Sequence, residues 1–150
     1  MANIKCMRVI LTLVALAAVA AGAWFAFLGW DQEYYEVDGV AQGPYRPWQV
    51  IACGAVIVLA CTAAFAYLRR VWLLAVIPAV AVVGFAVPWA AWASQDDTGL
   101  WVVGLLFLLV GGTMGLTAWL AVGYGVVEAF RAVRRRRTGT RSASGPGAGW

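Results

Sequence analysis

Four apolar runs, each long enough to cross a lipid bilayer, constrain this chain more than any other feature. They cover residues 9–30, 49–68, 71–93 and 100–127. A helix needs about 20 mostly apolar residues to span the hydrocarbon core, and a helix of a soluble protein would carry polar residues along one side. These runs are apolar on every side. The sequence therefore predicts an all-α polytopic membrane protein, folded as an antiparallel bundle of four transmembrane helices.

The charged residues between the runs predict how the bundle is oriented. The basic residues before the first run, between the second and third, and after the fourth are Lys5, Arg8, Arg69, Arg70, Arg131, Arg134, Arg135, Arg136, Arg137 and Arg141. Only Arg46 lies in the other set of loops, which holds every acid except Glu128. Because Lys and Arg are retained in the cytoplasm, both termini are predicted to be cytoplasmic. Ten arginines against one lysine, with many Ala, Val and Gly residues, favour the inner membrane of a GC-rich bacterium.

The first run also allows a second interpretation. A basic start, an apolar core and small-residue steps at residues 18–20 and 21–23 describe a cleavable signal peptide as well. The run continues to Leu28, which favours an uncleaved helix. We therefore expect a transmembrane domain over residues 1–130. Residues 131–150 form a basic, then Gly/Ser-rich tail, expected to be disordered from residue 138.

The loop between the first two runs is expected to be a small ordered cap outside the membrane. Asp38-Gly39 is the dipeptide that a type I′ hairpin turn favours, and it would set Val37 opposite Val40 and Tyr35 opposite Gln42. A mobile polar connector is the alternative. The candidate interaction residues of this loop are Asp31, Glu33, Tyr34, Tyr35, Glu36, Asp38, Tyr45 and Trp48.

Four acids of this loop raise the question of a cation. They stand at positions 31, 33, 36 and 38, which does not match the alternating ligands and central glycine of a calcium-binding EF-hand loop. We predict no metal site and a solvated acidic loop. Weak Ca²⁺ or Mg²⁺ binding, or docking of a basic partner surface, remain the alternatives.

Small residues and arginines mark two kinds of candidate contact surface. Close approach of backbones through small residues is a main route to helix association in lipid. The candidate packing residues are Ala18 and Gly22 in the first run and Gly104, Gly111 and Gly115 in the fourth. A partner helix within the same chain is favoured over another protomer. Arg131, Arg134, Arg135, Arg136 and Arg137 are candidate contacts to anionic lipid headgroups.

The residues that are missing exclude several chemistries. The chain has no histidine, which removes His-based haem, zinc and acid–base catalysis. No acidic or basic residue lies inside the four runs before Glu128, whereas ion-coupled transporters and proton relays depend on such groups. Cys53 and Cys61 are too far apart on one helix to form a disulfide. We expect no enzyme activity, no cofactor and no nucleic-acid partner.

The residues at the end of the first outer loop and the start of the second apolar run resemble a known group of proteins. Gly43-Pro44-Tyr45, followed by Trp48-Gln49-Val50 and a Cys-containing helix, resembles a group of small four-span integral membrane proteins of actinobacteria. That group has no assigned activity. The resemblance implies the four-helix arrangement and no catalytic residues.

Two functions remain. The leading hypothesis is a non-enzymatic interaction or accessory subunit of a membrane assembly, acting as a homo-oligomer or with another membrane protein. The alternative is a small oligomeric pore or carrier for a neutral or lipophilic solute. Thr62, Thr113 and Thr117 are too few to line an aqueous path, which favours the first hypothesis.

Overall fold

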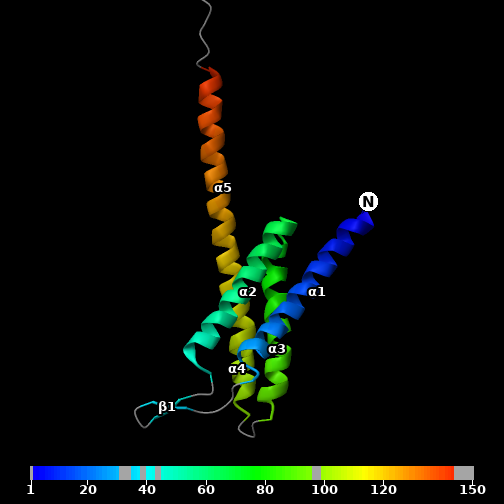
Figure 1. The fold of residues 1–150 in the computed structure, drawn as a ribbon. Helices are drawn as coiled ribbons and strands as arrows, with labels where there is room; N and C mark the ends of the chain where they lie inside the picture. Colours follow the sequence, from blue (N-terminus) through cyan, green and yellow to red (C-terminus); the bar gives the residue numbers. More distant parts are fainter. Residues whose placement is uncertain (1, 31–34, 38–39, 43–44, 96–98, 144–150) are drawn as a thin grey trace, which may run out of the picture.

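The computed structural model describes residues 2–30, 35–37, 40–42, 45–95 and 99–143. Its elements are α1 (Ala2–Phe27), β1 (Tyr35–Val37), β2 (Val40–Gln42), α2 (Pro47–Leu68), α3 (Leu73–Ala93), α4 (Trp101–Phe107), the π-helical turn η1 (Leu108–Gly112) and α5 (Thr113–Ala143). Four helical segments are long and apolar enough to cross a membrane, the fourth being the continuous run α4–η1–α5. The predicted all-α membrane bundle of four helices is confirmed (Figure 1).

The helices at the two chain ends are longer than the predicted runs. Helix α1 begins at Ala2, so Lys5 and Arg8 belong to its first turns. Helix α5 continues to Ala143 and extends well beyond the rest of the bundle (Figure 1). The expectation of disorder from residue 138 is therefore corrected for residues 138–143. Arginine is a good helix former, and an existing helix adds residues far more easily than a new one starts.

Helix α3 is the centre of the bundle. It packs against α1, α2 and α5, and α1 also packs against α2. Helices α1 and α3 approach closely at Gly84, where a Cβ atom would lie 2.7 Å from the carbonyl oxygen of Ala17. Only a residue without a side chain lets the two backbones approach this far.

Two clusters of buried side chains hold the helices together. One lies toward the α2–α3 turn and has Cys61, Leu73, Ile77 and Ala81 at its centre, all with no exposed surface. The other lies toward the hairpin and joins Trp24 of α1 and Leu28, just after α1, to Cys53 of α2. Helix α1 thus supplies side chains to the core at both ends.

The hairpin has the predicted register. Strands β1 and β2 pair antiparallel, with Tyr35 opposite Gln42 and Val37 opposite Val40. A two-residue connection fixes this pairing, as the Asp38-Gly39 dipeptide predicted. The two turn residues themselves lie outside the described residues.

Candidate functional site

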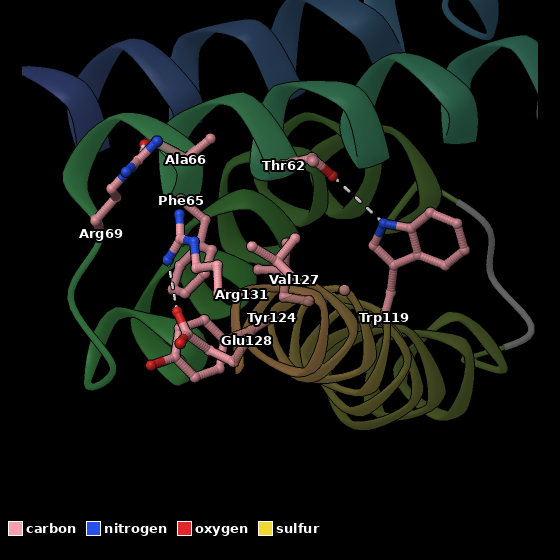
Figure 2. A pocket seen from close by; sticks show the side chains of 11 residues that line it. Thr62, Phe65, Ala66, Arg69, Trp119, Tyr124, Val127, Glu128 and Arg131 are labelled. Atoms are coloured by element: carbon pink, nitrogen blue, oxygen red, sulfur yellow. Dashed lines mark hydrogen bonds and ion pairs between the residues drawn. The ribbon is translucent and has the colours of Figure 1, made fainter. Parts of the chain in front are cut away.

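A groove of about 530 Å³ lies between α2 and α5, on the half of the bundle nearer the α2–α3 turn (Figure 2). We call it the α2–α5 groove. It is lined by Thr62, Phe65, Ala66 and Arg69 from α2 and its C-cap, and by Trp119, Leu120, Gly123, Tyr124, Val127, Glu128 and Arg131 from α5. It exists because α5 touches α2 only lightly and small residues at positions 66 and 123 leave space between them.

Polar contacts border the groove at its two ends. At one end Trp119 Nε1 donates a hydrogen bond of 3.3 Å to Thr62 Oγ1. At the other, Arg131 Nη1 donates to Glu128 Oε1 at 2.6 Å, one helical turn apart on α5. The rings of Phe65 and Tyr124 meet edge to face between these ends, with centroids 5.9 Å apart.

Arg69 stands at the rim of the groove in an unusual backbone conformation. It caps the C-terminus of α2 with φ of 49° and ψ of 44°, in the left-handed region. Its backbone N–H donates to the carbonyl of Phe65, and its Nε donates to the carbonyl of Ala66 at 3.1 Å. A cation at the negative end of the helix dipole is favourable. The αL cap brings the chain around within a few residues to start α3 at Leu73.

The chemistry of the α2–α5 groove is that of a binding surface. Glu128 is engaged by Arg131 and the guanidinium of Arg69 caps its own helix, so the charges of the groove are held in local contacts at one end and the rest of its walls are largely apolar. Among its described lining residues, no nucleophile stands next to a base. The groove suits an apolar side chain or an uncharged lipophilic molecule.

Four of the five small residues predicted to pack do not contact another helix of this chain. A Cβ atom added at Gly22, Gly111 or Gly115 would meet nothing within 4 Å, and Ala18 is exposed. Within this chain these residues face open space, so the favoured intramolecular partner is wrong for them. Gly104 does pack, since its Cβ would lie 3.1 Å from the ring of Trp89.

The π-helical turn η1 explains why Gly111 does not face the same side of the fourth span as Gly104. In a regular helix, residues seven apart share a face, which would place Gly111 beside Gly104. The wider turn over Leu108–Gly112 adds one residue. Gly112 therefore takes the place on the α3 side, with its Cβ position 3.1 Å from Val82, and Gly111 is turned away.

The structure describes only some of the candidate interaction residues of the first loop. Asp31, Glu33, Tyr34 and Asp38 lie outside the described residues, and Tyr35 and Glu36 belong to β1. The ring of Tyr45 lies 6.1 Å from that of Trp92 and packs against the cluster around Trp24, whereas Trp48 is exposed. Tyr45, just before α2, is thus held against the bundle.

A capping interaction that the sequence analysis missed fixes the start of α2. Gln49 is fully buried, and its Oε1 accepts a hydrogen bond of 2.7 Å from the backbone N–H of Arg46. Gln at the third helical position after a Pro-initiated start is the sequence sign of such a capping box. The start of α2 is therefore fixed by the contact between Gln49 and Arg46 as well as by Pro47.

The arginines predicted to contact lipid continue α5 as a helix. Arg131, Arg134 and Arg135 are exposed and lie three and four residues apart, so they share one face. Arg136 and Arg137 follow on the same helix. Among the described residues, no group of three or more His, Cys, Asp or Glu side chains is placed to hold a metal ion.

Gly39→Val is expected to make the hairpin about tenfold more sensitive to limited proteolysis. A type I′ turn needs positive φ, which costs a β-branched residue about 1–2 kcal/mol. Asp38→Asn is the matched control, because Asn-Gly satisfies the same turn. Equal cleavage of Gly39→Val and the native protein would contradict the turn.

The double variant Glu33→Gln, Glu36→Gln should leave the protease sensitivity of the hairpin unchanged. Ca²⁺-dependent protection in the native protein that is lost in the double variant would reveal a cation site.

Comparison with protein-family models, with curated proteins and with solved structures finds no match to this chain. The resemblance to the actinobacterial four-span group stays a prediction.

Proposed function

We propose that this integral membrane protein is a non-enzymatic accessory subunit that binds another membrane-spanning helix along its fourth span. The fourth span is the one least covered by its own chain. Only 6% of its apolar stretch is buried inside the protein, against 28%, 17% and 33% for the first, second and third. Most of the apolar surface of the fourth span is therefore available to a partner helix or to lipid.

The glycines of the fourth span support a protein partner. Gly111 and Gly115 lie four residues apart on α4–η1–α5 and face open space. Small residues at this spacing let a second helix approach closely, and in lipid such packing is a main source of association energy. The partner is a second copy of this chain or a different membrane protein.

Gly111→Leu and Gly115→Leu are expected to weaken this association by about tenfold, or ~1.4 kcal/mol. The native protein and the variants are extracted in mild detergent, and oligomer size and co-purifying membrane proteins are compared. Both variants should keep the thermal stability of the monomer, because their side chains enter open space.

Gly112→Leu is the matched control at the next residue. Its side chain would collide with Val82, so it should lower monomer stability by about 1–3 kcal/mol. Unchanged oligomer size and partner recovery in both the Gly111 and Gly115 variants would contradict the proposal.

The α2–α5 groove supports a second candidate function, the carriage of a neutral or lipophilic solute. Its walls are apolar and its charges are engaged in local contacts. Such a carrier would keep its size in the Gly111 and Gly115 variants and would bring no second polypeptide, so the same purification separates the two functions.

We further propose that the protein lies in a bacterial inner membrane with both termini in the cytoplasm. Basic residues from three separate segments gather at one end of the bundle: Lys5, Arg8 and Arg70 line one pocket, and Arg69 and Arg131 line another. This gathering supports the positive-inside orientation. It also supports contact of the arginines of α5 with anionic headgroups.

A further inference from the structure

A pocket with uncompensated positive charge lies on the side of α2 that faces α1. It has a volume of about 170 Å³ and is lined by Lys5, Arg8, Val9, Tyr67, Leu68 and Arg70. We call it the basic mouth. It is separate from the α2–α5 groove, with which it shares no lining residue.

The three cations of the basic mouth are available to an anion. No carboxylate lines the pocket. The side chains of Lys5, Arg8 and Arg70 make no hydrogen bond or ion pair to any other residue that the structure describes. Lys5 and Arg8 come from the first turns of α1 and Arg70 from the turn after α2, so the fold brings Arg70 beside two cations from a distant part of the chain.

An apolar trough continues from the basic mouth along the α1–α2 boundary. It measures about 280 Å³ and is lined by Thr12, Ala15, Leu16, Val19, Ala60, Ala63, Ala64 and Tyr67. Tyr67 lines both hollows and so joins them. Apart from Tyr67, α2 contributes only alanines to the trough, and their short side chains leave the space open. We call it the alanine trough.

The length of the two hollows matches one leaflet of a membrane. From Arg8 to Val19 the rise along α1 is about 16 Å at 1.5 Å per residue. Half of a hydrocarbon core is about 15 Å. The basic mouth at the headgroup level is complementary to the phosphate of a phospholipid, and the apolar trough below it is complementary to an acyl chain.

We propose that the basic mouth and the alanine trough together bind one anionic phospholipid, with its phosphate on Lys5, Arg8 and Arg70 and an acyl chain along the alanines of α2. This site goes beyond the proposed accessory function, which uses the fourth span. Free phosphate would leave the trough unused. A zwitterionic lipid would bring its own cationic group next to the three cations, so it would supply no net negative charge to compensate them. A second copy, lying parallel in the same membrane, would bring its own basic mouth to the same level and be repelled.

The test compares lipid retention in the purified full-length protein. Native mass spectrometry counts bound phosphatidylglycerol during a titration, with phosphatidylcholine titrated in parallel. We expect one tightly held phosphatidylglycerol per chain. The triple variant Lys5→Gln, Arg8→Gln, Arg70→Gln should bind it about a hundredfold more weakly. The matched control, Arg134→Gln, Arg135→Gln, Arg136→Gln, removes the same charge from α5, which lines neither hollow, so it can weaken general contact with headgroups but should keep the one tightly held lipid.

A second variant tests the alanine trough without touching the cations. Ala63 is exposed and lines the trough, so Ala63→Phe fills it while leaving the core intact, which an unchanged unfolding temperature checks. It should lose the retained lipid. Equal retention by Ala63→Phe, displacement of the lipid by millimolar inorganic phosphate, or equal binding of phosphatidylcholine would each overturn the proposal. A dimer without retained lipid, broken by Ala63→Phe, would identify a second copy as the occupant instead.

Discussion

Gly84→Ala should destabilise the bundle by about 2–3 kcal/mol, although it adds a single methyl group. That methyl would lie 2.7 Å from the carbonyl oxygen and 2.8 Å from the Cα of Ala17. Both neighbours are backbone atoms, so no side-chain rotation relieves the collision. Helix α1 must move away from α3, and this separation also loosens the two core clusters that α1 joins.

Gly54→Ala is the control, and its expected effect on stability is the opposite of that of Gly84→Ala. Position 54 is also in a membrane-spanning helix, but an added Cβ there meets nothing within 4 Å. Alanine is a better helix former than glycine by about 1 kcal/mol, so this variant should be neutral or slightly stabilising. Thermal unfolding of both variants in the same detergent, followed by circular dichroism, gives the comparison. Equal unfolding temperatures would mean that α1 and α3 do not meet at this point.

The second large effect is the accessibility of cysteines to an impermeant thiol reagent in intact cells. Cys53 and Cys61 are buried in the bundle and Cys6 is exposed near the basic end of α1. With cytoplasmic termini, the native protein should remain unlabelled until the membrane is opened, and Cys6 should then react.

Introduced cysteines complete the labelling test in a Cys6→Ser background. Asp38→Cys and Asp96→Cys should be labelled from outside in intact cells. Ser142→Cys should be labelled only after the membrane is opened. The difference is between full labelling and none. Labelling of Ser142→Cys in intact cells, with protection of the other two, would reverse the orientation.

The sequence predicted the helices and the hairpin because local residues determine both. The thickness of a bilayer sets the length of an apolar run, so four spans can be recognised without knowledge of their partners. The hairpin register follows from a two-residue connection, and Val37 does lie opposite Val40.

The candidate sites were harder to predict because they depend on neighbours from distant parts of the chain. Gly84 has no local feature that sets it apart from Gly54, and its role comes from Ala17 of α1. Gly104, Gly111 and Gly115 share one face only if the helical period is constant along the fourth span, and the π turn interrupts that period. The α2–α5 groove and the alanine trough are hollows between helices, and no pattern within one helix shows them.

The left-handed conformation of Arg69 has a consequence for how the chain reaches the membrane. An L residue other than glycine in this region costs about 1–2 kcal/mol, and glycine would avoid that cost in the finished fold. During synthesis, however, basic residues next to a new span orient it before any helix has packed. The same position therefore serves two stages with opposite preferences, biogenesis favouring arginine and the completed turn favouring glycine. Glycine in place of Arg69 would stabilise the finished turn. In the proposed orientation it would also weaken the positive charge that orients α2 and α3 during insertion.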